Sequence, residues 1–200
     1  MGKAFTEEER LLVQEKLRRI GLKLFSEKGI KGVSIRELTS AVGIAQGGFY
    51  TFYADKTDFL VDLMECRIKE KLAVLKEQKK DSLNDPIKYI SDIFYAEGMH
   101  LKENKAFDNM LSGSLEMFFN TEMHVRKRLG GLYKDYMTFM VKFWEENGYY
   151  VEIDENGFAA MLRAAGVLFS NAAFIGEEQF DRIYSIFCVS EVNAFLRVSK

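Results

Sequence analysis

Apolar residues recur every three or four positions along most of this chain, a spacing typical of helices that bury one face. The first such stretch follows Thr6 and Glu9, which have the spacing of a capping box, the reciprocal side-chain cap that begins many helices. Its apolar positions are Val13, Leu17, Ile20 and Leu24. We predict a first helix that ends at Gly29, because glycine readily adopts the left-handed conformation that terminates a helix.

The densest local signals lie between Ser34 and Lys56. Ser34 and Glu37 repeat the capping-box spacing, and Gly43 is placed to end that helix after about two turns. The apolar positions of this helix are Ile35, Leu38 and Val42, which share one face. A second short helix is predicted to open at Ala45. Two short helices joined by a tight glycine turn form a helix-turn-helix.

The aromatic residues of the second short helix predict which side faces the core. Phe49 and either Phe52 or Tyr53 are expected to point inward. The outward positions are then Gln46, Gly47, Tyr50 and Thr51. This pattern indicates a small, polar and uncharged outer surface.

Helical periodicity continues to near the end of the sequence. Asp55 can cap a long helix over residues 55–79, and Asp85 followed by Pro86 is a favoured helix start. Further helices are predicted at about residues 86–102, 105–119, 122–147, 155–175 and 177–198. The stretch 149–153 has strand-like composition but no visible partner, so we expect an extended loop there. The sequence therefore predicts an all-α fold of about nine helices.

Composition limits the class of protein. The chain has 200 residues, 48% of them apolar, which is enough for a substantial core. Two cysteines, Cys66 and Cys188, are too few for a disulfide framework and lack metal-ligand spacing. No apolar run reaches the roughly 18 residues of a membrane span. We expect a soluble, cytoplasmic protein with no cofactor, no metal site and no membrane partner.

Charge is unevenly distributed along the chain, whose net charge is −2. Residues 1–56 carry ten Lys or Arg against seven Asp or Glu, whereas the remainder carries eighteen against twenty-three. Local positive charge is what meets the phosphates of a nucleic acid. The basic excess therefore accompanies the helix-turn-helix.

The segment from Ser34 to Lys56 resembles the DNA-binding motif of the TetR family of transcriptional regulators, of the TetR/AcrR type. The resemblance rests on the glycine turn Ala41-Val42-Gly43-Ile44, on Gly47, on the aromatic run Phe49-Tyr50-Thr51-Phe52-Tyr53 and on Lys56. Ala45 and Ala54 depart from it, since the family usually has Ser or Thr at the first position and often Pro at the second. The resemblance implies a DNA-binding domain over residues 1–54, with its motif at 34–53. It also implies a ligand-binding and dimerisation domain over 55–200, linked by the helix 55–79.

The same resemblance implies a homodimeric repressor that binds a palindromic site in double-stranded DNA. The positions expected at the DNA are Ser34, Arg36, Ala45, Gln46, Gly47, Tyr50, Thr51, Tyr53 and Lys56. Gln46 can present its amide to adenine, while Tyr50 and Thr51 can contact a thymine methyl group or a phosphate. The remaining polar side chains Ser34, Arg36, Tyr53 and Lys56 are assigned to phosphates, which set orientation and not sequence.

The helices after residue 86 are rich in aromatic side chains and methionine, which pack imperfectly and favour an apolar cavity. We expect a small, largely apolar or aromatic effector there. The expected lining is Phe94, Met110, Met117, Phe118, Tyr136, Phe139, Met140 and Phe143. Helical period alone does not separate these positions from ordinary core.

Two apolar stripes with small residues mark the last two predicted helices, which in the TetR family form a four-helix dimer interface. The resemblance implies an interface at Phe158, Met161, Ala165, Phe169, Ala172, Phe180, Tyr184 and Phe187. Packing within one chain is the alternative interpretation.

Two other classes of function stay open. A helical protein-interaction module without DNA binding would fit the uncharged second motif helix. An enzyme would need clustered ionisable groups, for which only His100 with Glu97 or Glu103 offers material. We find no nucleophile elbow, no phosphate-binding glycine loop and no histidine pair at metal spacing, so an enzyme is the weakest hypothesis.

Overall fold

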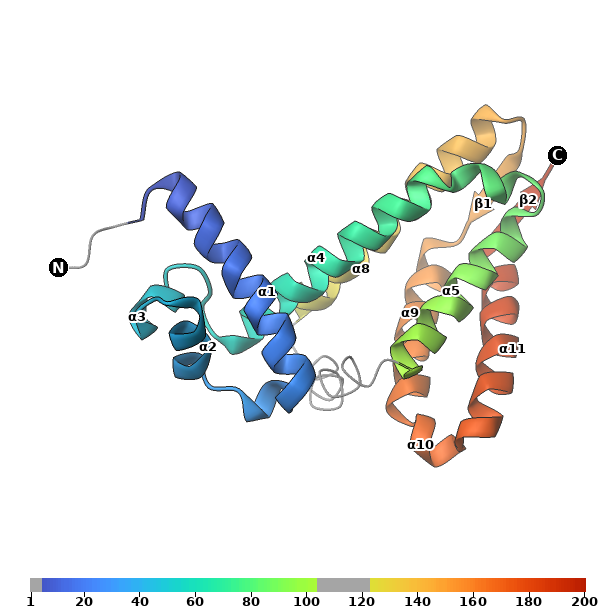
Figure 1. Ribbon diagram of the computed structural model, residues 1–200. Coiled ribbons are helices and arrows are strands. Elements are labelled where there is room, and N and C mark those ends of the chain that lie inside the picture. Colours follow the sequence, from blue (N-terminus) through green and yellow to red (C-terminus); the bar gives the residue numbers. More distant parts are fainter. Residues whose placement is uncertain (1–4, 104–122) are drawn as a thin grey trace. The chain divides into compact units, whose positions relative to one another are not determined.

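The computed structural model describes residues 5–103 and 123–200, and within these ranges the fold is helical with a two-stranded sheet (Figure 1). The described residues divide into two compact units, residues 5–66 and residues 67–103 with 123–200. We call them the N-terminal unit and the C-terminal unit. None of the described helices is long and apolar enough to cross a membrane.

The N-terminal unit consists of α1 (Glu7–Gly32), α2 (Ile35–Val42), α3 (Gln46–Phe49) and the first half of α4 (Lys56–Glu77). The C-terminal unit contains the second half of α4, the 3-10 helix η1 (Lys79–Leu83), α5 (Pro86–Glu103), α8 (Met123–Glu146), β1 (Tyr150–Ile153), α9 (Glu155–Ser170), α10 (Ala172–Ile175), α11 (Glu177–Phe195) and β2 (Leu196–Ser199).

Three helix starts follow the local signals of the sequence. The Thr6 amide donates to Glu9 Oε2 at 2.8 Å, and the Glu9 amide donates back to Thr6 Oγ1 at 3.2 Å, which completes the capping box of α1. Asp55 caps α4 by accepting from the Asp58 amide at 2.8 Å. Asp85 caps α5, which begins at Pro86. These predictions are confirmed, because each depends only on residues within one helical turn.

One local prediction holds and another needs correction. Gly29, with φ 67° and ψ 165°, breaks the regular helix as predicted, and the bounds of α1 extend beyond this kink to Gly32, with Ile30 buried. Ser34 caps α2 by accepting from the Glu37 amide at 3.1 Å, but the Glu37 carboxylate pairs with Lys28 and does not complete a capping box.

The predicted loop at residues 149–153 is wrong, because β1 pairs with β2 in an antiparallel sheet. The register aligns Tyr150 with Ser199 and Ile153 with Leu196. The partner strand is hard to see in the sequence, since its apolar residues continue the helical spacing of α11. The predicted helix 177–198 therefore ends early, at Phe195.

The predicted helix over 155–175 is interrupted at Asn171, which separates α9 from α10. Its side-chain amide donates to the Val167 carbonyl at 2.8 Å, a local bond that competes with helix continuation. The predicted linker over 81–85 overlaps η1. The predicted helix over 105–119 lies outside the described residues.

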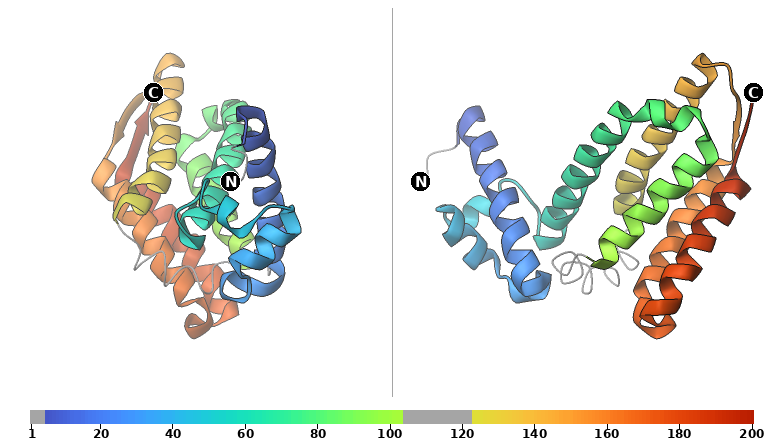
Figure 2. Two further views of the ribbon diagram at one scale, coloured as in Figure 1. Left: turned by 90° about the vertical axis from the view of Figure 1, so that its left-hand side faces the viewer. Right: turned by 45° about the vertical axis from the view of Figure 1, so that its right-hand side comes forward.

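Aromatic side chains fill the core of the N-terminal unit, whose three first helices are seen in Figure 2. Phe59 of α4 lies at its centre, fully buried, with ring centroids 5.7 Å from Phe25 and 5.8 Å from Phe49. Its ring also lies against the backbone of Gly21, where an added Cβ would come within 2.4 Å of the ring. Glycine at this position therefore allows α1 to approach α4 closely.

In the C-terminal unit, α5 and α9 each pack along α11 (Figure 1). A Cβ at Gly98 would lie 2.2 Å from the Tyr184 ring, so glycine here permits the close approach of α5 to α11. The buried Trp144 of α8 donates from Nε1 to Ser82 Oγ at 2.7 Å. This bond fixes η1 against the end of α8.

Candidate nucleic-acid interface and cavity

The turn between α2 and α3 has the conformation that the sequence predicts. Gly43 has φ 86° and ψ 30°, in the left-handed region, and its amide donates to the Thr39 carbonyl at 2.9 Å. Ile44 is half-buried against the core of the unit. Ala45 precedes α3 without any side-chain cap. The sharp turn holds α3 across the end of α2.

The inward and outward sides of α3 also agree with the sequence. Phe49 is fully buried and Tyr53 is 4% exposed, whereas Tyr50 is 53% exposed. The other exposed residues of this segment are Ala45, Gln46, Gly47 and Thr51. The structure therefore brings the outward positions together on one surface, with an aromatic base beneath them.

Gly47 has open space on its outer side, because an added Cβ would meet no atom within 4 Å. Packing inside the unit therefore does not explain a glycine here. The absence of a side chain instead leaves the α3 backbone accessible to a partner molecule.

Tyr53 differs from its predicted role as a phosphate contact. Its buried hydroxyl donates to Asp62 Oδ2 at 2.7 Å, and burial together with this hydrogen bond raises the pKa of Tyr53 far above its ordinary value. The ring packs against Phe59 at an interplanar angle of 56°, with centroids 4.8 Å apart. Tyr53 therefore fixes the end of the motif to α4 and does not present its hydroxyl on the surface.

Arg18 completes this network from α1. Its Nε and Nη2 donate to the two Asp62 carboxylate oxygens at 2.7 and 2.8 Å, and this bidentate hydrogen bond raises the pKa of Arg18. Asp62 is 8% exposed, so the carboxylate joins α1, α4 and the end of the motif in a low-dielectric position. The sequence could not indicate this pair, because the partners are 44 positions apart.

Lys56, at the start of α4, has two protein partners. Its ammonium donates to the Ile30 carbonyl, at the end of α1, at 2.6 Å and to the Val33 carbonyl, between α1 and α2, at 2.9 Å. These bonds hold the start of α4 against the end of α1. Its predicted contact with a phosphate stays a prediction.

Other cations surround the motif. Arg36 and Lys31 are exposed, and Ser34 is exposed at the start of α2. Arg10 was not expected in this region: its Nη2 donates to the Thr51 carbonyl at 3.2 Å, and its guanidinium lies 5.0 Å from the centre of the Phe52 ring. The start of α1 thereby supports the end of the motif.

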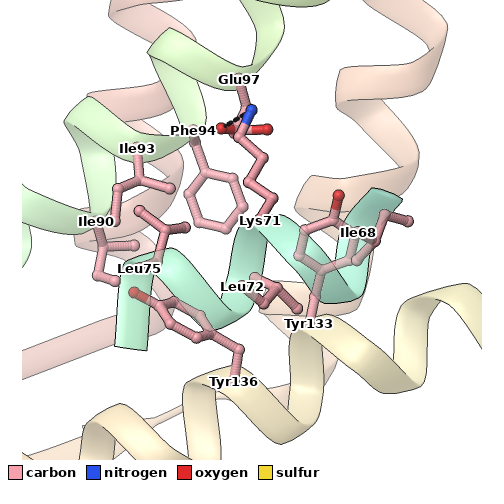
Figure 3. A pocket seen from close by; sticks show the side chains of 10 residues that line it. All are labelled: Ile68, Lys71, Leu72, Leu75, Ile90, Ile93, Phe94, Glu97, Tyr133 and Tyr136. Atoms are coloured by element: carbon pink, nitrogen blue, oxygen red, sulfur yellow. Dashed lines mark ion pairs between the residues drawn. The ribbon is translucent and has the colours of Figure 1, made fainter. Parts of the chain in front are cut away.

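A cavity in the C-terminal unit lies between α4, α5 and α8 (Figure 3). Its lining is Ile68, Lys71, Leu72, Leu75, Ile90, Ile93, Phe94, Glu97, Tyr133 and Tyr136. The free volume of this cavity is about 20 Å³, which is enough for one or two water molecules.

The predicted lining agrees with this cavity at Phe94 and Tyr136. Met140 is instead fully buried in the core, and the rings of Phe139 and Phe143 lie about 5 Å from the Lys79 ammonium. These three residues share the face of α8 that carries Tyr136 and lie about one to two turns farther along the helix. Met110, Met117 and Phe118 lie outside the described residues.

Polar groups also line the cavity: Tyr136 is one of the expected lining residues, whereas Lys71, Glu97 and Tyr133 are not. Lys71 and Glu97 form an ion pair, drawn at one end of Figure 3. Burial, with Glu97 nearby, raises the pKa of Tyr133 to about 12. The Tyr136 hydroxyl is buried and has no hydrogen-bond partner among the described residues.

Four of the expected dimer-interface residues are buried within their own chain. Phe158, Met161, Phe180 and Tyr184 are at most 4% exposed. The other four are half-buried: Ala165, Phe169, Ala172 and Phe187. The apolar stripes that the sequence reveals are therefore the inward faces of α9 and α11, since long apolar side chains mark the core first.

Exposed apolar side chains of α9 and α11 lie on other positions. They are Val167, Ile183, Ile186 and Val189, each at least 40% exposed. Smaller residues, Ala160 and Ser190, accompany them on the exposed side. This set is available to a second molecule, and the predicted interface stays a prediction, since four of its residues are partly exposed.

Metal chemistry finds no support in the described ranges, where no three His, Cys, Asp or Glu side chains gather as a metal site would require. The thiols of Cys66 and Cys188 are not disulfide-bonded, and burial raises the pKa of Cys188 to about 11.

Comparison with known proteins identifies similar sequences and folds. Residues 19–63 match the model of bacterial regulatory proteins of the tetR family. The nucleoid occlusion factor SlmA of Haemophilus ducreyi is 27% identical over 180 residues, which cover 84% of this chain and 85% of that protein.

Two solved structures have the same fold. RolR in complex with resorcinol has a TM-score of 0.70 at 17% identity, with 95% of this chain and 90% of that chain covered. SmeT, the repressor of a multidrug efflux pump of Stenotrophomonas maltophilia, has a TM-score of 0.59 at 14% identity, with 92% and 90% covered.

Proposed function

This chain belongs to the TetR family of DNA-binding transcriptional regulators, and from that premise we propose that it is a homodimeric repressor, released from a palindromic operator by a small effector. In this proposal, residues 1–54 bind the operator, and residues 55–200 bind the effector and form the dimer. The protein acts in the cytoplasm, where the DNA is, and catalyses no reaction.

The proposal that this chain binds DNA rests on the exposed surface of α3. Gln46, Tyr50 and Thr51 lie outward around Gly47, while Phe49 and Tyr53 are buried beneath. A helix of this kind enters the major groove with its N-terminal residues against the base edges. Gln46 is the residue suited to read a base, because its amide can both donate to and accept from adenine.

Phosphate contacts are assigned to exposed polar groups that flank α3. Arg36 is the strongest candidate, because its guanidinium is exposed and can pair with a phosphate in two hydrogen bonds. Lys56 would have to exchange its two carbonyl partners for a phosphate. Tyr53 is no longer included, since its hydroxyl is held by Asp62.

The test is selection of binding sites from random duplex DNA with the full chain, followed by affinity measurements on single-base variants. Gln46→Ala should relax preference at one base position, costing about 1–3 kcal/mol of discrimination there. Arg36→Ala should weaken all sequences alike and reduce the salt slope by about one unit. Arg19→Ala, at an exposed cation of α1, serves as control. Equal effects of Gln46→Ala and Arg36→Ala on every sequence would contradict this division of roles.

The dimer is proposed to form through the exposed apolar set of α9 and α11. Replacing Ile186 by Glu places a charge in that set and should yield a monomer in sedimentation, with loss of affinity for the palindrome. Val74→Glu is a matched control, because Val74 is similarly exposed but lies on α4. A dimer that persists in Ile186→Glu would contradict this interface.

Release of DNA is explained by linkage between two binding sites. An effector that prefers the conformation unsuited to DNA lowers operator affinity by the same coupling energy, typically about 1–3 kcal/mol. The cavity of the C-terminal unit is the proposed effector site, because apolar walls with few polar groups are typical of small-molecule pockets.

A second candidate is nucleoid occlusion, the role in the name of the relatives that align with 84% of this chain. In both roles the protein binds DNA. The two roles differ in the consequence of binding, since a repressor controls a promoter beside its operator. Mapping the bound sites across a genome distinguishes them: a repressor occupies a few promoters, whereas many sites away from promoters would favour the second role.

A further inference from the structure

The cavity between α4, α5 and α8 has a composition that restricts the chemistry of its occupant. Its walls are mainly aliphatic and aromatic, with the branched side chains of Ile68, Leu72 and Ile90 among them. Such walls favour an apolar ring or chain. The polar groups of the cavity then decide what else the occupant carries.

The first polar feature is the ion pair of Lys71 and Glu97. The two side chains are 40% and 23% exposed, so they border the cavity on its more open side. Because they neutralise each other, they present no net charge to an occupant. An anionic ligand would have to displace Glu97 from Lys71, and a cationic ligand would have to displace Lys71 from Glu97. Either exchange costs desolvation without a net gain of ion pairs.

The second polar feature is the hydroxyl of Tyr136. The side chain is 4% exposed, and the oxygen has no hydrogen-bond partner among the described residues. After burial, the Tyr89 hydroxyl contributes to the raised pKa of Tyr136 by its charge and by a weak polar contact that falls short of a hydrogen bond. Tyr89 itself donates to the Leu75 carbonyl at 3.5 Å. The Tyr136 hydroxyl therefore stays protonated at neutral pH and is an unused O–H donor. A buried polar group in this state destabilises the protein, and a ligand that accepts its hydrogen removes that penalty.

The two polar features are separated. In Figure 3 the Lys71–Glu97 pair and the Tyr136 hydroxyl lie at different sides of the cavity, with Leu75 and Phe94 drawn between them. An occupant that reaches Tyr136 must therefore lie along the apolar walls. The present free space is smaller than an aromatic ring, so binding has to move half-buried side chains such as Ile93 and Phe94 outward.

On the basis of the proposed function, we propose that the effector is a small, uncharged compound with an apolar body and a hydroxyl group, and that its oxygen accepts a hydrogen bond from Tyr136. The apolar body displaces the side chains between α4 and α5. Movement of α4 is the route from this site to DNA, since α4 contributes to both units.

The experiment uses three probes of nearly equal shape: 4-ethylphenol, ethylbenzene and 4-ethylbenzoate. The first is uncharged at pH 7 and carries a hydroxyl, the second has no polar group, and the third is an anion. Calorimetry with the full chain is expected to give the order of affinity 4-ethylphenol, ethylbenzene, 4-ethylbenzoate. Equal affinity of the anion and the phenol, or no binding of any probe, would overturn the proposal.

Tyr136→Phe isolates the hydroxyl, because it removes the oxygen and keeps the ring. We expect the affinity for 4-ethylphenol to fall about tenfold, while that for ethylbenzene is retained or increases. Tyr150→Phe is the matched control, since the exposed Tyr150 hydroxyl bonds to Glu152 on the sheet and lies outside the cavity lining. An unchanged preference for the phenol in Tyr136→Phe would overturn the assignment.

A parallel titration of protein bound to its selected operator separates this inference from the proposed function. If 4-ethylphenol binds through Tyr136 without altering operator affinity, the chemical class stands and the release mechanism fails. If a charged compound releases the operator while the phenol does not bind, the regulator stands and the class fails.

Discussion

Two tyrosines, one in each unit, show how differently the interiors are built. In the N-terminal unit the Tyr53 ring packs against Phe49 and Phe59, and its hydroxyl donates to Asp62. In the C-terminal unit Tyr136 is equally buried, but its ring borders a cavity and its hydroxyl has no partner among the described residues. A domain that presents fixed contacts to DNA gains from a filled core and satisfied polar groups. A domain that admits a ligand has to leave both space and hydrogen-bonding capacity unused.

The largest effect should come from emptying the N-terminal core. Phe59→Ala should reduce the free energy of unfolding by about 3–5 kcal/mol, because the fully buried ring contacts three other aromatic rings. Urea denaturation followed by circular dichroism reports on both units, whereas fluorescence of the single tryptophan, Trp144, reports on the C-terminal unit.

In Phe59→Ala we expect part of the helical signal to be lost at lower urea concentration, while the transition seen by tryptophan fluorescence is unchanged. Leu11→Ala, at a 66% exposed position of the same unit, should change stability by less than about 0.5 kcal/mol. Equal shifts of both signals in Phe59→Ala would show that the units do not unfold separately.

Gly21 and Gly98 each lie against an aromatic ring, so replacing them by alanine compares how well the core of each unit accommodates an added methyl group. Gly21→Ala pushes on Phe59, and Gly98→Ala pushes on Tyr184 and Phe169. Both should destabilise, by about 1–3 kcal/mol, with the larger loss at Gly98 because the added Cβ would lie 2.2 Å from the buried Tyr184 ring, against 2.4 Å from Phe59 at Gly21. Gly130→Ala, on α8 with open space around it, should instead stabilise by up to about 1 kcal/mol. A larger loss at Gly21 would reverse the comparison.

Two carboxylates test the contribution of burial to the ion pairs. Asp62→Asn should cost about 1–2 kcal/mol and weaken operator binding, because Arg18 and Tyr53 lose a shared charged acceptor. Asp92→Asn breaks an exposed pair with Lys88 and should change the free energy of unfolding by less than about 0.5 kcal/mol. Thermal unfolding at two salt concentrations checks both, since salt screens the Asp92 pair more strongly.

The smallest effects concern the tyrosine hydroxyls themselves, and here the two units should differ in sign. Tyr53→Phe should lose about 1 kcal/mol, since the Asp62 carboxylate loses a donor. Tyr136→Phe should be neutral or gain up to about 1 kcal/mol without ligand, since it removes an unsatisfied group. Urea titrations of the two variants measure both changes in the free energy of unfolding. Destabilisation by Tyr136→Phe would show that the hydroxyl has a hydrogen-bond partner.

Local signals explain why the N-terminal motif could be predicted closely. The caps at Thr6 and Asp55 and the turn at Gly43 each depend on residues within one helical turn. The inward position of Phe49 could be predicted from the sequence, whereas the choice between Phe52 and Tyr53 needed the structure, which buries Tyr53. The roles of individual DNA-facing residues stay predictions, because they depend on a partner molecule.

The rest depends on contacts between distant positions. Arg18 and Asp62 are hydrogen-bonded although they are 44 positions apart in the sequence, and Trp144 and Ser82 although they are 62 positions apart. The strand β2 exists only because β1 lies beside it. The expected pocket and dimer residues were chosen by hydrophobicity, which identifies the inward face of a helix but does not separate a core from a cavity. Exposed isoleucine and valine of α11 are evident only once that inward face is known.

The pairing of β1 with β2 has a practical consequence for work with this protein. Residues 196–199 are a strand that holds the end of α11 to the segment after α8, with Asp154 donating from its amide to the Phe195 carbonyl at 2.7 Å. Deletion of residues 196–199 would remove the hydrogen-bonding partner of β1, and a bulky label attached to these residues would lie against the sheet. Labels intended to leave the molecule undisturbed belong on exposed helix positions such as Lys142.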